Sequence, residues 1–176
     1  SLGSGRLRTP KRPLYASRYT AEVLRQGGRQ AWYEFPEYVT PIAVDEEVAD
    51  GRVLDLAGIK IQAISTPGHT PGCMSWGLDT SDGLVVLTGD LLGSDGNPGW
   101  AGSEGFSAWA TIRSLQKLIK LAPKRVYWGH GPIAGSVTHW LEKAVARGRA
   151  GMWRLATALH PHIKPPPGFE TRAIKV

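Results

Sequence analysis

The sequence predicts a mixed α/β domain, and three observations support this prediction: the length of 176 residues, the 41% apolar content and the order of strand-like and helix-like segments. A chain of this length usually forms one domain with a hydrophobic core, and such an apolar content argues against a disordered protein. Strand-like segments crowd the first half, and a helix, a strand and a further helix follow, an order typical of mixed α/β domains. We therefore expect one domain over residues 1–176, with a flexible, basic start at 1–12 and a C-terminal helix and proline-rich tail at 141–176.

Most of the strands are expected in the first half of the chain. Residues 59–65 alternate apolar and polar side chains, as in a strand with one buried face, and residues 84–88 form a continuous apolar run typical of a buried strand. The helix expected here covers residues 19–26, because Ser17 is a suitable N-cap and the glycines at 27–28 would end it. The expected strands and extended segments are 13–16, 38–48, 52–56, 59–65, 74–78 and 84–88.

Helices and one further strand are expected in the second half. The segment 89–105 is rich in Gly, Ser and Asn, and as a loop it is long enough to have a function of its own. Gly148 and Gly151 are weak points of the last helical segment, which is expected as one long helix or two shorter ones. The expected elements are a helix at 107–121, a strand at 125–128 and helical structure at 137–159.

The composition excludes several classes of protein. The only cysteine, Cys73, cannot form an internal disulfide or a cysteine-only zinc site, so any metal must be held by histidine and carboxylate side chains. No apolar run approaches the roughly 20 residues that cross a bilayer, and residues 1–12 lack the apolar stretch of a secretory signal. We therefore expect a cytoplasmic protein that does not associate with membranes. The net charge is +6, but the basic residues cluster at the two ends of the chain, which argues against nucleic-acid binding.

Three segments share one design, in which a strand runs directly into a polar residue flanked by glycine. They are TPGHTPG around His69, LTGD ending at Asp90 and GHGP around His130. A glycine at a strand end leaves room for a ligand close to the backbone. Taken singly, each segment is a common surface turn, but their joint occurrence at three strand ends indicates one shared site if the strands are neighbours. Two imidazoles and one carboxylate suit zinc, iron or manganese.

These three motifs, in this order and at this spacing, resemble the second half of the metallo-β-lactamase fold hydrolases over about residues 13–140. The resemblance implies a four-layer αββα sandwich of two sheets flanked by helices, with a metal pair at one edge. It also implies a metal-activated water that attacks an ester, thioester, amide or phosphodiester. By the same resemblance, His69 belongs to the first metal, Asp90 bridges the two metals as the catalytic carboxylate, and His130 belongs to the second metal.

The principal signature of that family, His-x-His-x-Asp-His, is absent, and no histidine precedes His69. The segment PLYASRYTAEVLRQ resembles the strand and helix that normally follow this signature. We therefore expect a half or truncated sandwich, a mixed sheet with helices on one face, and a metal site that is incomplete in this chain. Because a sheet built to be covered exposes an apolar face, we expect a homodimer or a complementing N-terminal half as the partner.

Three hypotheses for function follow. The first is a metal-dependent hydrolase of a small-molecule substrate, present as a C-terminal portion that is inactive alone. The second is a non-catalytic binding or assembly protein that keeps the fold, and the third is a relative of the family's RNA-processing nucleases. The candidate substrate-binding residues flank the loop after Asp90 and are Trp100, Phe106 and Trp109. The remaining cysteine and histidines are expected as core, helix-surface or tail residues: Cys73, His139, His160 and His162.

Overall fold

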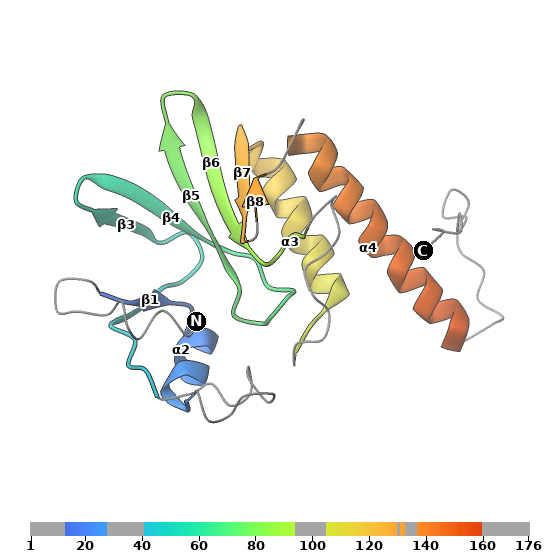
Figure 1. Cartoon of the computed structure of the whole chain (residues 1–176), viewed down its shortest axis with the longest axis horizontal. Coiled ribbons are helices and arrows are strands. Elements are labelled where there is room, and N and C mark those ends of the chain that lie inside the picture. The colour runs from blue at the N-terminus through green and yellow to red at the C-terminus, as the bar shows by residue number, and fades with distance from the viewer. Residues whose placement is uncertain (1–12, 28–40, 94–104, 130, 133–136, 160–176) are drawn as a thin grey trace.

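One mixed sheet forms the centre of the computed structural model, which describes residues 13–27, 41–93, 105–129, 131–132 and 137–159. In the described residues this sheet has six strands, in the order β3-β4-β5-β6-β7-β8 (Figure 1). All neighbouring pairs are antiparallel except β6 and β7, which are parallel. The strands are β3 (Val53–Leu56), β4 (Ile59–Ser65), β5 (Met74–Thr80), β6 (Gly83–Gly89), β7 (Arg125–Trp128) and β8 (Gly131–Pro132).

Tight turns join β3 to β4 and β5 to β6, residues 66–73 form a longer loop between β4 and β5, and a helix joins the parallel pair. Between β3 and β4, Ala57 and Gly58 have positive φ angles of 56° and 86°, as a two-residue hairpin turn requires, and the Asp55 carboxylate accepts a hydrogen bond of 2.8 Å from the Gly58 backbone N–H. Parallel strands cannot be joined by such a turn, because the chain must first run back to the opposite end of the strands before the next strand can begin in the same direction. Helix α3 (Ala108–Leu121) makes this return between β6 and β7.

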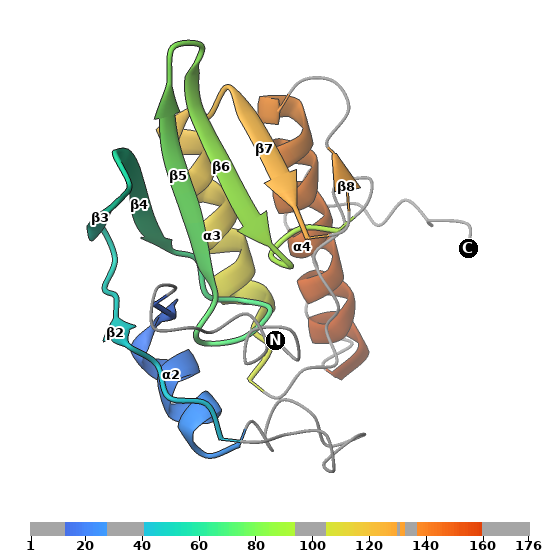
Figure 2. The ribbon, with the colours of Figure 1, turned by 60° about the vertical axis from the view of Figure 1, so that its left-hand side comes forward.

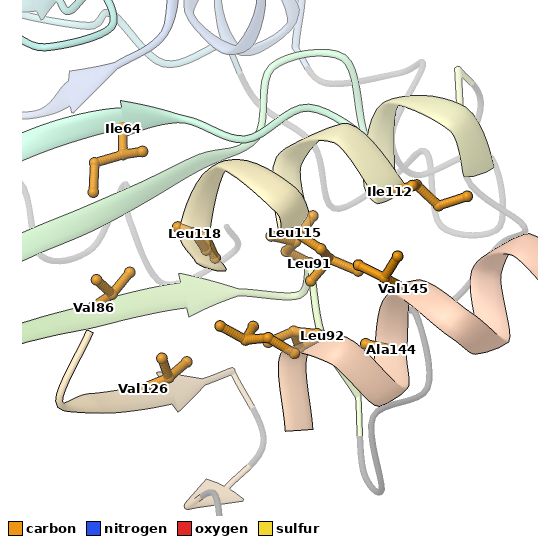
Figure 3. Close-up of a cluster of buried hydrophobic side chains, with 11 residues drawn as sticks. Ile64, Val86, Leu91, Leu92, Ile112, Leu115, Leu118, Val126, Ala144 and Val145 are labelled. Carbon is orange, nitrogen blue, oxygen red and sulfur yellow. The ribbon is translucent and has the colours of Figure 1, made fainter. Parts of the chain in front are cut away.

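Helices α3 and α4 (Val137–Leu159) cover one face of the sheet (Figures 1 and 2). Strand alternation turns Ile64, Val86 and Val126 toward these helices, and Figure 3 shows how the helices' leucine, alanine and valine side chains meet them. Helix α4 is continuous through Gly148, where a Cβ atom would lie only 3.0 Å from Ile112 Cγ1 of α3. Gly148 therefore permits close approach of the two helices and does not divide α4.

Two short strands and one helix form a smaller unit beside the sheet, next to the loop that joins β4 and β5. Strand β1 (Tyr15–Ala16), labelled in Figure 1, pairs in parallel with β2 (Glu46–Glu47), labelled in Figure 2, and helix α2 (Arg18–Arg25) follows β1. Ser17 caps this helix, since its side chain accepts a hydrogen bond from the Thr20 backbone N–H. Beside this unit, Val48 forms a second apolar cluster with the buried residues of β3 and β4 on the sheet face opposite to α3.

No helix in the described residues covers the rest of that second face, seen toward the viewer in Figure 2. Its side chains form two apolar rows that cross the strands in register, and we call them together the outer face. Leu87 and Tyr127 of this face are each 42% exposed, and Ile59 at its margin is 58% exposed. The two rows are Ile61, Leu78 and Val85, and Trp76, Leu87 and Tyr127.

The expected fold class and most expected elements are confirmed. The mixed sheet has its long helices on one face, and the bounds 59–65, 125–128 and 137–159 are those of β4, β7 and α4. The extended stretch 38–48 forms a strand only at Glu46–Glu47 within its described part, and the sequence does not predict the short β8. None of the helices in the described part of the chain combines the length and apolar character that crossing a membrane requires.

Candidate metal centre

Three strands of the sheet end at the same edge. Strands β4 and β6 run in the same direction because each is antiparallel to β5, and β7 runs parallel to β6. The loop with His69 follows β4, Asp90 directly follows β6, and Gly129 directly follows β7. The sheet topology therefore places the His69 loop and Asp90 at the same end of the strands, with β5 between β4 and β6. His130, the next residue after Gly129, lies outside the described residues.

Asp90 is held against the end of β7. A Cβ atom at Gly129 would collide with Asp90 Oδ1, so the carboxylate occupies space that only a glycine leaves open. The Gly129 backbone N–H donates a hydrogen bond of 3.0 Å to the Gly89 carbonyl, which ties the two strand ends together. Gly89 has a φ of 55°, and Leu91 and Leu92 are buried behind Asp90. The chain thus turns sharply before Asp90 and is anchored in the core after it.

The His69 loop, defined here as residues 66–73, lies against the start of α3. A Cβ atom at Gly68 would collide with Thr111, and the Gly68 carbonyl accepts a hydrogen bond of 2.9 Å from the Ser107 backbone N–H. The Ser114 hydroxyl donates a hydrogen bond of 2.7 Å to the Pro67 carbonyl. His69 itself is half-buried. Its side chain therefore projects from a loop whose backbone is fixed by contacts far along the chain.

The remaining candidate residues lie in different surroundings. Phe106 is half-buried just before Ser107, the N-cap of α3, and Trp109 in the first helical turn is 56% exposed. Cys73 is half-buried, and its Sγ atom lies 3.0 Å from Thr70 Oγ1 within the His69 loop. His139 is exposed on α4. Three further candidates lie outside the described residues: Trp100, His160 and His162.

The donor chemistry fits a transition metal. An imidazole nitrogen and a carboxylate oxygen are ligands that zinc accepts, and His130 would add a second imidazole. Within the described ranges, which omit His130, no three histidine, cysteine, aspartate or glutamate side chains gather as a metal-binding group. The described residues alone therefore do not form a complete metal-binding group.

The residues that hold the His69 loop cannot be recognised from the sequence. Ser17 is predicted there only as a helix cap, and Ser107 and Ser114 only as parts of a helical segment. Their partners in the loop lie some 40 to 55 positions away in the chain. A short-range pattern contains no signal for such pairings.

The chain is similar to known metallo-hydrolases. The sequence model of the metallo-beta-lactamase superfamily matches residues 6–130. The uncharacterized protein YobT of Bacillus subtilis is 37% identical over 101 residues, which are 51% of this chain and 42% of that protein. A Bacillus velezensis protein named "Probable polyketide biosynthesis zinc-dependent hydrolase BaeB" is 40% identical over 83 residues, which are 46% of this chain and 35% of that protein. The matched part thus spans less than half the length of these curated relatives.

Solved structures show the same fold. A metallo-beta-lactamase family protein of Thermus thermophilus superimposes with a TM-score of 0.65 at 23% identity, over 84% of this chain and 56% of that one. A metallo-beta-lactamase of Cronobacter sakazakii gives a TM-score of 0.59 at 22% identity, over 83% of this chain and 63% of that one. At these identities the likeness concerns the fold alone.

Proposed function

Because the chain belongs to the metallo-β-lactamase superfamily, whose sequence model matches residues 6–130, we propose that it acts as the C-terminal portion of a metal-dependent hydrolase. In this proposal, His69, Asp90 and His130 are metal ligands at one edge of the sheet. The observation that supports it best is the contact of the Asp90 carboxylate with Gly129, because it brings an oxygen ligand beside the residue that precedes His130. Zinc suits this donor set.

The ligands have different roles in this proposal. His69 offers an imidazole nitrogen from the loop after β4, and Asp90 offers carboxylate oxygens that would offset part of the charge of the metal. When bound, zinc supplies Lewis acidity that lowers the pKa of water toward neutrality and polarises an ester, thioester, amide or phosphodiester. In this proposal the small-molecule substrate contacts three aromatic residues that follow Asp90 in the sequence: Trp100, Phe106 and Trp109.

A binuclear site would take further ligands from outside these 176 residues. His69, Asp90 and His130 would give a single zinc ion three protein ligands and an open position for water, but a binuclear site needs about twice as many protein ligands. The sequence does not contain the His-x-His-x-Asp-His signature that would supply them. We infer that a complementing segment provides these ligands, so the chain alone hydrolyses generic esters, thioesters and phosphodiesters at little above background.

In this proposal the isolated chain associates with a second copy, because the exposed apolar side chains of the outer face are buried when two such faces meet. Two charged side chains of the described residues lie in line with its two rows, and both are paired. Arg125 forms an ion pair of 3.5 Å with Asp82, and Arg52, opposite Ala63, forms one of 3.1 Å with Glu46. Two outer faces can therefore meet around a two-fold axis without burying an unpaired charge. Four strands about 4.8 Å apart, with about five residues of about 3.3 Å each, give roughly 320 Å² per copy. This is below the roughly 800 Å² per partner of a standard interface, so the dimer is weak.

Zinc binding by equilibrium dialysis tests the ligand assignment. We expect weak binding of zinc by the wild type, and at least a 10-fold loss of affinity in His69→Ala and in Asp90→Ala. His139→Ala is the matched control, since this histidine is exposed on α4, and it should bind like the wild type. Zinc binding that survives the combined loss of His69 and Asp90 would contradict the assignment.

Complementation tests the enzymatic part of the proposal. A purified segment that contains the His-x-His-x-Asp-His signature, added in trans, should produce zinc-dependent hydrolysis with the wild type and none with Asp90→Ala. Formation of the complex without turnover would instead favour a binding protein that keeps the fold.

A further inference from the structure

The His69 loop is held at both ends by hydroxyl and amide donors from two helices. On the α3 side, the Ser114 hydroxyl and the Ser107 backbone N–H donate to the carbonyls of Pro67 and Gly68. On the α2 side, two hydroxyls donate to the Gly72 carbonyl, from a part of the chain more than 50 positions earlier. His69 lies between these two attachments.

The attachment to α2 has a defined geometry. Ser17 Oγ donates to the Gly72 carbonyl at 2.7 Å, and Thr20 Oγ1 donates to the same oxygen at 3.1 Å. The two hydroxyls are themselves 3.1 Å apart, and Ser17 Oγ also accepts from the Thr20 backbone N–H at 3.2 Å as the cap of α2. A carbonyl oxygen has two lone pairs, so it can accept both hydrogen bonds.

Gly72 is shaped for this contact. It is buried, and a Cβ atom there would collide with Thr20 Oγ1 and lie 2.9 Å from Ser17 Oγ. Any other residue at this position would push the start of α2 away from the loop. The close approach is therefore a specific feature of these three residues, which we call the α2 clasp.

We propose that Ser17 and Thr20 are positioning residues that hold the His69 loop in its metal-binding conformation, so that the start of α2 sets the metal affinity of a histidine on another element. The inference rests on the proposed function, in which His69 is a ligand. A ligand held in place before binding loses less conformational freedom on binding, and residues that orient ligands typically change metal affinity 10–100-fold. Ser17 and Thr20 act through the loop backbone and do not touch the metal.

Thr20→Val tests the clasp, because valine keeps the branched shape of threonine and removes the hydroxyl that reaches Gly72. Thr20→Ser restores a hydroxyl and should rescue the effect. Thr80→Val is the matched control: Thr80 Oγ1 also donates to a glycine carbonyl, that of Gly83 at 2.7 Å, in the turn between β5 and β6. That turn lies at the opposite end of the strands from the His69 loop.

Two measurements are made on each variant, the zinc dissociation constant and the amide hydrogen exchange of the metal-free His69 loop. In Thr20→Val we expect a zinc dissociation constant raised about 10-fold and faster exchange of the Gly68 and Cys73 amides, which donate within the loop. Thr20→Ser and Thr80→Val should resemble the wild type in both measurements.

The outcomes separate the clasp from the proposed function. Unchanged exchange in Thr20→Val, or an equal loss of zinc affinity in Thr80→Val, would overturn the clasp while leaving His69 as a ligand. Faster exchange together with no zinc binding by the wild type would overturn the proposed function, and with it the effect on affinity.

Discussion

At the level of single residues, the proposed metal site depends on the contact between Asp90 and Gly129. The carboxylate lies in the space left by the missing side chain of Gly129, and the backbone hydrogen bond between Gly129 and Gly89 keeps the two strand ends together. The position of the carboxylate is thus a property of two residues that are neighbours in space and distant in sequence.

Gly129→Ala should displace the Asp90 carboxylate. The added methyl group would collide with Oδ1, so we expect zinc affinity to fall about 10-fold, the size typical of lost ligand orientation. Gly151→Ala is the control, because nothing lies within 4 Å of a Cβ atom there. Isothermal titration with zinc measures both variants, and equal affinities would show that Asp90 does not need its place beside Gly129.

A second residue-scale contact ties the end of β4 to α3. Asp50 Oδ1 accepts hydrogen bonds of 2.7 Å from the Ser65 backbone N–H and 2.6 Å from Lys117 Nζ. Burial raises the pKa of the Asp50 carboxyl, but the hydrogen bonds from Lys117 and Ser65 and the charge of Lys117 together hold that pKa below its ordinary value of 3.8. Folding therefore favours the ionised form of Asp50.

The sign of the pH dependence follows from this lowered pKa. The stability contributed by Asp50 is fully present above the unfolded-state pKa of 3.8 and is lost as the pH falls through the lower folded-state pKa. Because the pair is half-exposed, with side-chain exposures of 38% and 55%, we expect Asp50→Asn to cost only about 0.2–1 kcal/mol near neutral pH. Urea unfolding of Asp50→Asn should approach the wild type on acidification. Asp82→Asn removes a longer and more exposed ion pair with Arg125, so it should lower the free energy of unfolding by less than Asp50→Asn does.

At the scale of elements, α3 links the core to the candidate site. Its inner residues pack on the sheet, while its first turn holds the carbonyls that precede His69. The sequence predicts α3 closely, as a helix at 107–121, from the helical spacing of its apolar residues, and the structure adds that Ser107 is its N-cap. The sequence does not predict which loop the helix holds, because that contact depends on the order of strands in the sheet.

The two glycines of α4 differ in what a side chain would meet, so they form a matched pair for testing how α3 and α4 pack. Gly151→Ala should raise the free energy of unfolding by about 0.5–1 kcal/mol, since alanine favours helix and the site is open. The free energy of unfolding of Gly148→Ala should be at least about 1 kcal/mol lower than that of Gly151→Ala, because the added methyl group would crowd the buried Ile112. Chemical denaturation measures both, and equal stabilisation would mean that the helices do not pack this closely.

For the whole molecule, the alternation of apolar residues predicts the sheet, and the motif order predicts the superfamily. The strand-end design of TPGHTPG and LTGD predicts that His69 and Asp90 lie at one sheet edge, because carboxyl ends of strands that run in the same direction meet there. The outer face can be expected from the sequence only through the expectation of a half or truncated sandwich. The α2 clasp cannot be expected, since caps and turns predict local contacts and the clasp joins residues that are 52 and 55 positions apart.

Association through the outer face should depend on Leu87. Leu87→Glu places a charge at a site that is 42% exposed in one copy and would be buried between two, so we expect the weak dimer to dissociate. Leu121→Glu is the matched control, because Leu121 is also a leucine and is 39% exposed but lies at the end of α3, outside the outer face. This variant should leave association unchanged. Sedimentation equilibrium over a range of concentrations distinguishes the two, and a wild type that stays monomeric throughout would contradict the proposed dimer.

The most direct test of the metal site is a crystal of the wild-type chain grown with zinc, with diffraction data collected on both sides of the zinc absorption edge. We predict an anomalous difference peak at the carboxyl-terminal end of the strands, within coordination distance of His69, Asp90 and His130. A fully occupied zinc ion elsewhere in the chain, or imidazole and carboxylate groups directed to opposite faces of the sheet with no peak between them, would contradict it.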